Sequence, residues 1–304
     1  MIPIVSVVTA VYNDEKYIRK SIESILHQTF DNFEYLVVDD GSTDKTLEIL
    51  EEIAKLDKRV KILTQKNSGA AAARNLAMHV AKGKYIALQD SDDISLPKRI
   101  EMQVNQLQQS PYNLISCTSH SIIDTNDNII TTSNKVYKNI NDNILNGRLC
   151  FCHPTMMLSK ELLLKVNGYN FFYRKSEDFD LILRLIENNG YVDKINMCLY
   201  NYRIREDSEG SKNNGAFTKR VYENYLNRKK NKPENFTLVD TTYKTDKDFI
   251  LKRHAKEIFY SENYSQYIKL YKKGFHKLPV KEYLLFFIYS LLPPTVKKII
   301  KKMR

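Results

Sequence analysis

The first 120 residues alternate between short, continuous apolar runs and longer segments whose apolar side chains recur at helical spacing. Continuous apolar runs are typical of strands that are buried on both faces of a sheet. The predicted strands are 4–11, 33–40, 59–64, 84–90 and 113–119. The predicted helices between and after them are 14–28, 42–56, 68–82 and 96–109. Strands that alternate with helices predict an α/β fold with a mostly parallel sheet covered by helices.

The pattern becomes weaker in the second half of the chain. Residues 177–191 still predict an amphipathic helix, and residues 216–275 have a helical pattern that is rich in tyrosine and lysine. These features predict two parts, which are an α/β domain over 1–215 and a helical, basic C-terminal region over 216–304.

Charge changes the picture for the C-terminal part only. The 304-residue chain has a formal net charge of +11. Residues 216–304 carry 21 Lys and Arg against 8 Asp and Glu, whereas residues 1–215 carry 26 against 28. A basic segment suggests an anionic partner, either a membrane surface or a nucleic acid. No recognised nucleic-acid-binding module accompanies the charge, so we expect no nucleic acid partner.

The C-terminal tail, 284–304, combines an apolar run with a basic end. The run from Leu284 to Leu292 would span about 14 Å as a helix, against about 30 Å for the core of a bilayer. The last eight residues carry five positive charges. We therefore expect peripheral docking on anionic lipid at the inner face of the plasma membrane. The alternative is a helix that packs on the α/β domain and leaves its basic end in solvent.

Cysteine usage and the N-terminus both favour a cytoplasmic protein. Cys117, Cys150, Cys152 and Cys198 match no zinc-binding spacing, so we expect buried, reduced thiols. The N-terminal stretch has neither the basic segment nor the small-residue cleavage site of a secretory signal.

Carboxylates follow two of the predicted strands. Asp39 and Asp40 end one strand, and Asp90, Asp92 and Asp93 end or follow another. Ligands of parallel sheets gather at the carboxyl ends of the strands, so both clusters are expected at the same edge. Mg²⁺ typically takes one or two carboxylates together with substrate phosphates. The alternative is that the first cluster only forms a turn and the second is a solvated loop that caps the next helix.

A third acidic stretch, EDFDL, has two possible explanations. Glu177 and Asp178 suit a general base, because a carboxylate placed against a hydroxyl can accept its proton. They also suit a helix N-terminus, where acidic side chains complement the helix dipole. The sequence contains neither G-x-G-x-x-G nor a Walker loop, so a dinucleotide or P-loop site lacks support.

The order of these motifs is more specific than any of them alone. The succession is VSVVTAVYN, VVDDGSTD, NSGAAAARN, YIALQDSDD, HPTMMLSKEL and GYNFFYRKSEDFDLILRL. Over residues 3–211 this succession resembles the family 2 glycosyltransferases. The resemblance implies the GT-A fold, a Rossmann-like and mostly parallel sheet flanked by helices. It also implies a nucleotide-sugar half over about 1–120 and an acceptor half over about 121–215.

The resemblance implies a donor site in the first half. The residues that it places near the nucleotide are Thr9, Ala10, Tyr12, Asp39, Asp40, Arg74, Asp90 and Ser91. Asp39 corresponds to the carboxylate that contacts the base, and Ala10 stands where the family usually has proline. Asp90 and Asp92 correspond to the D-x-D motif that meets ribose, metal and diphosphate. A divalent cofactor, Mn²⁺ or Mg²⁺, is therefore implied, with Asp92 as its ligand.

For the second half the resemblance implies Asp178 as the catalytic base of an inverting enzyme, with Glu177 in a supporting role. Asp93 in the first half and His153 in the second fall in stretches that border the donor or the acceptor. Arg205 stands where the family commonly has histidine. Arginine has no lone pair for a metal, so we expect Arg205 to neutralise the donor diphosphate instead.

Together these features predict an inverting glycosyltransferase of the hexosyl or N-acetylhexosaminyl type. It would move a sugar from a nucleoside-diphosphate donor, preferably a UDP-sugar, to a hydroxyl of a glycan or lipid-linked acceptor. The resemblance implies surface polysaccharide or lipooligosaccharide synthesis. The alternatives are a metal-dependent nucleotidyl- or phosphoryl-transfer enzyme on a similar α/β fold and a binding protein that has lost catalysis.

Overall fold

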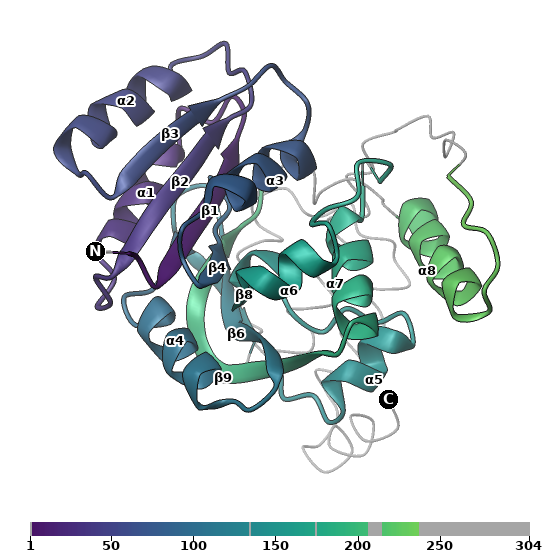
Figure 1. Cartoon of the computed structure of the whole chain (residues 1–304). Coiled ribbons are helices and arrows are strands. Elements are labelled where there is room, and N and C mark those ends of the chain that lie inside the picture. Colours follow the sequence, from purple (N-terminus) through teal and green to yellow (C-terminus); the bar gives the residue numbers. More distant parts are fainter. Residues whose placement is uncertain (1, 134, 174, 206–214, 237–304) are drawn as a thin grey trace, which may run out of the picture. The chain divides into compact units, whose positions relative to one another are not determined.

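The computed structural model describes residues 2–133, 135–173, 175–205 and 215–236 (Figure 1). The strands within these residues are β1 Val5–Val11, β2 Phe33–Asp39, β3 Val60–Thr64, β4 Tyr85–Leu88, β5 Ile94–Ser95, β6 Asn113–Ile123, β7 Ile129–Ser133, β8 Met157–Ser159 and β9 Gly190–Arg203. The helices are α1 Ile18–Leu26, α2 Thr46–Leu56, α3 Ala70–Val80, α4 Arg99–Gln109, α5 Ile140–Leu145, α6 Lys160–Lys165, α7 Glu177–Glu187 and α8 Gly215–Lys229, with a 3-10 turn, η1, at His153–Thr155.

In the described residues, one nine-stranded sheet has the order β3-β2-β1-β4-β8-β6-β9-β5, with β7 paired to β6. The first four strands of this order are parallel to one another, as the alternating pattern predicts. β8 runs antiparallel between β4 and β6, whereas β6 and β9 are again parallel. Because β1 lies between β2 and β4, the carboxyl ends of all three strands lie at one edge. This arrangement confirms the predicted common edge of the two acidic clusters.

Helices cover both faces of the parallel strands, which explains why those strands are apolar along their whole length (Figure 1). Neighbouring residues of β1 point to opposite faces. Val7 belongs to the apolar cluster that includes side chains of α1, α2 and α4, whereas Val8 belongs to the cluster that includes side chains of α3, α6, α7 and α8. The second cluster joins the first half of the sheet to the helices that follow it in the chain.

The helix predicted over 177–191 is shorter in the structure, because α7 ends at Glu187 and β9 begins at Gly190. Asn189 has a left-handed φ of 66°, which ends the helical backbone. A Cβ atom at Gly190 would lie 2.6 Å from the carbonyl oxygen of Leu185, so only glycine permits this tight connection. The connection leads into β9, which pairs with β6. The apolar periodicity of the sequence did not predict this pairing.

The helical pattern predicted from residue 216 is present as α8, and the predicted helical residues beyond 236 lie outside the described residues. The tail 284–304 also lies outside them. Contacts between residues divide the chain into two units, and α8 belongs to the first unit together with residues 1–203. Of the described residues, Ile204 and Arg205 belong to the second unit. No helix in the described part of the chain has both the length and the apolar character needed to cross a bilayer.

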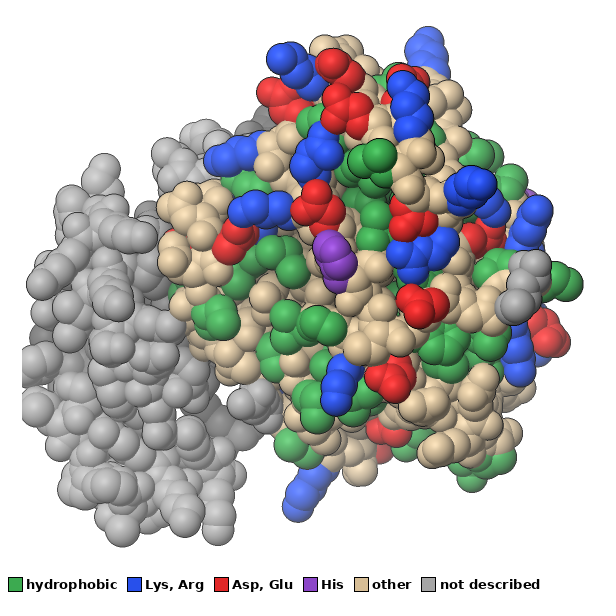
Figure 2. Space-filling model, turned by 90° about the vertical axis from the view of Figure 1, so that its left-hand side faces the viewer, with side chains coloured by type: hydrophobic (Ala, Val, Ile, Leu, Met, Phe, Trp, Pro, Cys, Tyr) green, Lys and Arg blue, Asp and Glu red, His purple; other side chains and the backbone are tan. Residues whose placement is uncertain are grey.

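Charges are mixed on the described surface. Figure 2 shows one face on which Lys and Arg side chains alternate with Asp and Glu side chains and with small apolar areas. This mixture agrees with the near balance of charges in residues 1–215. The basic excess of the chain therefore belongs to its C-terminal part.

Candidate active site

Asp39 and Asp40, at the end of β2, have different surroundings. Asp40 accepts hydrogen bonds from the backbone N–H groups of Ser68, at 2.8 Å, and Gly69, at 2.7 Å. These bonds hold the segment that leads into α3. Asp39 is buried, and its Oδ2 accepts the N–H of Ser42 at 3.1 Å. Its Oδ1 is buried and has no hydrogen-bond partner among the described residues.

The residues expected on the first strand lie beside Asp39. Thr9 is fully buried, and its hydroxyl donates to the carbonyl oxygen of Gln89 at 2.8 Å, which ties β1 to the end of β4. Ala10 is partly buried, and Tyr12 is 48% exposed. Ala10 and Tyr12 are therefore at least partly accessible, whereas Thr9 is not.

The loop after β4 carries the predicted D-x-D motif. Asp90 is partly buried and accepts a hydrogen bond from Arg74 Nη2 at 2.8 Å. The Ser91 hydroxyl donates to Asp14 Oδ2 at 2.6 Å. Asp14 was not among the site residues predicted from the sequence. Asp92 is partly exposed. Asp93 is fully buried, and burial together with the charges of Asp92 and Asp90 raises its pKa well above the usual value.

Arg203, the last residue of β9, holds this loop in place. Its backbone N–H donates to Asp93 Oδ1 and its Nε donates to the carbonyl oxygen of Asp92, both at 2.7 Å. The guanidinium also pairs with Asp127 Oδ1 at 2.6 Å. Sequence reasoning missed Arg203, because only its place at the end of a strand marks it. Arg205 follows two residues later and is partly buried.

Arg74 links residues from the two predicted halves of the site. Its Nη2 binds Asp90 after β4, and its Nη1 lies 3.7 Å from Glu177 Oε1 at the start of α7. Asp178 is the next residue in α7. The structure thus brings three of the predicted acidic residues around one predicted arginine.

Burial controls the protonation of the carboxylate pair. Desolvation and, after it, the charge of Asp178 raise the pKa of Glu177 to about 7, although Arg74 opposes the shift. Desolvation also raises the pKa of Asp178, although the N–H of Phe179, 2.8 Å from Asp178 Oδ1, stabilises the charged form. Carboxylates with raised pKa values are suited to proton transfer near neutral pH.

His153 is buried next to Tyr169. Its Nε2 shares a hydrogen bond of 2.7 Å with the Tyr169 hydroxyl. Burial lowers the pKa of His153 well below its usual value, so the ring is neutral at neutral pH. The Arg74 guanidinium carbon lies 5.6 Å from the centre of the Tyr169 ring. Tyr169 was not predicted, and its only signal was the GY pair shortly before EDFDL.

The residues of the D-x-D motif fit a shared metal ion rather than a closed protein site. Among the described residues, no group of three His, Cys, Asp or Glu side chains is arranged as a metal site. Asp90 and Asp92 offer carboxylate oxygens, which hard divalent cations prefer. Such an ion would need further ligands from the diphosphate of a donor.

The comparisons with known proteins give the class of this protein. An uncharacterized glycosyltransferase of Methanocaldococcus jannaschii is 34% identical over 265 residues, which cover 85% of this chain and 86% of that protein. The O-antigen biosynthesis glycosyltransferase WbnJ of Escherichia coli is 36% identical over 211 residues, 68% of this chain and 82% of that protein. This chain is a glycosyltransferase. Residues 6–166 match the model of glycosyl transferase family 2, and the chain belongs to that family.

Solved structures confirm the fold. The structure of S. aureus TarS 1-349 in complex with UDP-GlcNAc has a TM-score of 0.59 and 20% identity, and the match covers 84% of this chain and 72% of that chain. The complex with UDP has a TM-score of 0.58, also at 20% identity, and covers 94% and 80%. The likeness confirms the expected GT-A fold.

Proposed function

We propose that this glycosyltransferase transfers a sugar from a UDP-sugar to an acceptor hydroxyl with inversion of the anomeric configuration. The observation that carries the proposal is the Arg74 bridge. It links Asp90, in the motif expected at the donor diphosphate, to Glu177, beside the expected base. The expected donor-binding carboxylate and the neighbour of the expected base thereby lie on two sides of one guanidinium.

The donor would lie along the carboxyl edge of the parallel strands. The unpartnered oxygen of Asp39 supports a contact with the nucleobase, because a buried carboxylate oxygen needs a donor group. Asp92 would hold Mn²⁺ or Mg²⁺ together with the diphosphate, and the ion would offset charge on the departing nucleotide. Arg74 would add positive charge for the diphosphate.

Asp178 would serve as the general base. It accepts the proton of the acceptor hydroxyl while that oxygen forms a bond to the anomeric carbon. The bond from the anomeric carbon to the diphosphate oxygen breaks in the same displacement, and the nucleoside diphosphate leaves with both bonding electrons. Attack from the opposite side inverts the configuration. Glu177 would support the base, and Asp93 and His153 would border the donor or the acceptor.

The relatives support the choice of substrates. WbnJ is named for O-antigen biosynthesis, and the TarS complexes contain UDP and UDP-GlcNAc. We infer a hexosyl or N-acetylhexosaminyl donor and a glycan or lipid-linked acceptor in surface polysaccharide or lipooligosaccharide synthesis. The cytoplasmic face of the membrane, reached through the tail 284–304, would be its place of action.

A screen of UDP- and GDP-sugars, with and without an acceptor extract, tests the proposal. We expect release of a nucleoside diphosphate and an anomeric product whose configuration, measured by NMR, is opposite to that of the donor. Release of pyrophosphate would indicate nucleotidyl transfer instead. Retained configuration would contradict the single displacement, and no turnover with any donor would favour a binding protein.

A further inference from the structure

A side-chain clamp joins α3 to the loop before α7. The Asn75 side chain is buried and makes two hydrogen bonds with the backbone of Tyr169. Its Nδ2 donates to the Tyr169 carbonyl oxygen at 2.9 Å, and its Oδ1 accepts the Tyr169 N–H at 2.8 Å. Asn75 directly follows Arg74, so the clamp fixes Tyr169 relative to the helix that carries the arginine.

Gly168 allows this close approach. It has a positive φ of 61°, and a Cβ atom at this position would clash with Asn75 Oδ1. A side chain here would therefore strain the backbone and displace the amide from the clamp. The clamp depends on a specific pair, Gly168 on the loop and Asn75 on the helix.

The Tyr169 side chain is fixed from two further directions. It is 1% exposed, and its hydroxyl is hydrogen-bonded to neutral His153. The Arg74 guanidinium lies near the ring, in the range where a cation is attracted to an aromatic ring. Tyr169 thus limits the positions that the Arg74 side chain can take.

We propose that Tyr169 is a positioning residue, which holds the Arg74 guanidinium between Asp90 and Glu177. The inference deepens the proposed function and rests on it. Without this constraint, Arg74 would neutralise the Asp90 carboxylate less well, and that carboxylate would repel the diphosphate of a donor. The charge balance of Glu177 and Asp178 would change at the same time. The Asn75 clamp and the Tyr169 ring would act through Arg74, which thereby connects donor binding to the proton acceptor.

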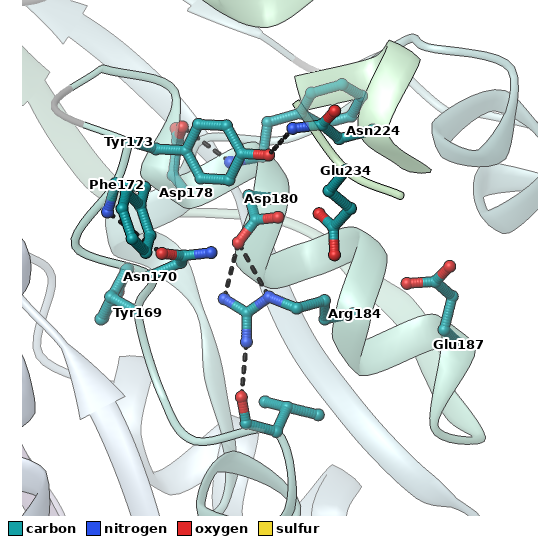
Figure 3. Close-up of polar contacts among 12 residues, drawn as sticks. Tyr169, Asn170, Phe172, Tyr173, Asp178, Asp180, Arg184, Glu187, Asn224 and Glu234 are labelled. Carbon is teal, nitrogen blue, oxygen red and sulfur yellow. Dashed lines mark hydrogen bonds and ion pairs between the residues drawn. The ribbon is translucent and has the colours of Figure 1, made fainter. Parts of the chain in front are cut away.

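Two conservative variants of the same loop test the proposal. Tyr169→Phe keeps the ring and removes the hydroxyl that binds His153. Tyr173→Phe is the matched control, because Tyr173 is also buried and its hydroxyl accepts a hydrogen bond from Asn224 at 2.7 Å, on the side of α8 (Figure 3). Both variants lose one buried hydrogen bond, so both should lose similar stability. Only the first should change the surroundings of Arg74.

Calorimetric titration with UDP gives a readout that does not need turnover. We expect Tyr169→Phe to weaken UDP binding about two- to tenfold, the usual range for one hydrogen bond. Tyr169→Leu also removes the ring and should weaken binding more. Tyr173→Phe should bind UDP as the wild type does. Equal affinities of Tyr169→Phe and Tyr173→Phe would overturn the proposal.

The pH profile of kcat/KM gives a second readout. The charged groups near Glu177 and Asp178 are Arg74, Lys175 and Asp90. Since Arg74 lowers the pKa of both carboxylates, its displacement in Tyr169→Phe should move the acid limb to higher pH, and Tyr173→Phe should not. An unmoved limb would contradict the proposal.

The two readouts separate this inference from the proposed function. Weaker UDP binding by Tyr169→Phe, without sugar transfer by the wild type, would leave the positioning role intact and reject the function. Sugar transfer by the wild type, together with equal UDP binding by Tyr169→Phe and Tyr173→Phe, would support the function and reject the positioning role. A wild-type protein that does not bind UDP would overturn both.

Discussion

At the scale of single residues, the two carboxylates at the start of α7 differ in what holds them. Glu177 lies 3.7 Å from the Arg74 guanidinium, whereas Asp178 accepts the N–H of Phe179. Arg74 lowers the pKa of both carboxylates, and burial raises both pKa values, that of Glu177 to about 7. The proposed assignment of Asp178 as the base and Glu177 as its support is therefore tested by substituting each of them.

Asp178→Asn keeps the size of the side chain and removes the proton acceptor. We expect kcat to fall about 10²–10⁴-fold, or about 3–5 kcal/mol in barrier, with donor affinity nearly unchanged. Glu177→Gln should cost less, and Asp142→Asn, in the first turn of α5, is a surface control. Steady-state kinetics of the three variants with a soluble acceptor shows which carboxylate is the base. A larger loss in Glu177→Gln than in Asp178→Asn would reverse the assignment.

The same carboxylates predict how activity depends on pH. A base works only when deprotonated, so kcat/KM must rise with pH through the pKa of the base. Burial raises the pKa of Asp178 and raises that of Glu177 to about 7, so the acid limb should lie well above the ordinary carboxylate range. Arg74→Met removes a charge that lowers both pKa values and should move the limb upward. A wild-type limb near about pH 4 would contradict this prediction.

The D-x-D motif predicts a dependence on divalent metal. Excess chelator should abolish donor turnover, and added Mn²⁺ or Mg²⁺ should restore it, because a diphosphate leaving group needs its charge offset. Asp92→Ala should remove turnover even with metal present. Nucleotide release measured over a metal titration tests both statements. Full activity in chelator would reject the metal.

At the scale of elements, α8 contacts α7, the helix that carries Glu177 and Asp178. Arg228 on α8 pairs with Glu187 at 3.0 Å and Glu234 at 2.8 Å, and lies 3.6 Å from buried Asp180 on α7. Asp180 is also paired with Arg184 at 2.7 Å, and Figure 3 shows this pair inside the bend between α7 and the preceding loop. Arg184 and Arg228 thus both stabilise the buried charge of Asp180, and removal of either arginine would destabilise the fold around it.

Arg228→Met should lower the free energy of unfolding by about 2 kcal/mol, since it removes charged hydrogen bonds to Glu187 and Glu234. Lys219→Met, on the same helix, removes only an exposed pair with Glu223 and should change stability by less than about 1 kcal/mol. Urea denaturation of both variants measures the difference. Equal midpoints would show that α8 does not support α7 through Arg228.

At the scale of the whole molecule, charge separates residues 1–215 from the C-terminal region 216–304. The face in Figure 2 mixes both signs, whereas residues 216–304 carry the basic excess. A protein whose acceptor is lipid-linked would gain from such a region, because anionic lipid attracts it to the surface where the acceptor lies.

Deletion of 284–304 should leave transfer to a soluble acceptor largely intact and weaken binding to anionic vesicles. Each lysine or arginine near the surface contributes about 1 kcal/mol, so removal of five should cost at least about tenfold in affinity. Flotation with anionic and with zwitterionic vesicles provides the comparison. Equal binding of the truncated and full-length proteins to anionic vesicles would exclude docking through the tail.

The sequence by itself determined the strands and helices of the first half apart from the short β5, because apolar periodicity reflects burial over a few residues. It also determined the family, since six motifs stand in order, and the common edge of Asp39 and Asp90, since parallel strands end on the same side. The end of α7 was predicted four residues too late, because NNG can continue a helical pattern until tight packing at Gly190 excludes it.

Only the tertiary structure decided which distant residues meet. Asn75 and Tyr169 are 94 positions apart, and Arg203 reaches the loop of Asp92 and Asp93 across more than a third of the chain. No local pattern encodes such pairs, because they form when strands from both halves enter one sheet. The antiparallel β8 between β4 and β6 brings the halves together, and Arg74 can bind Asp90 and Glu177 at once only in that arrangement.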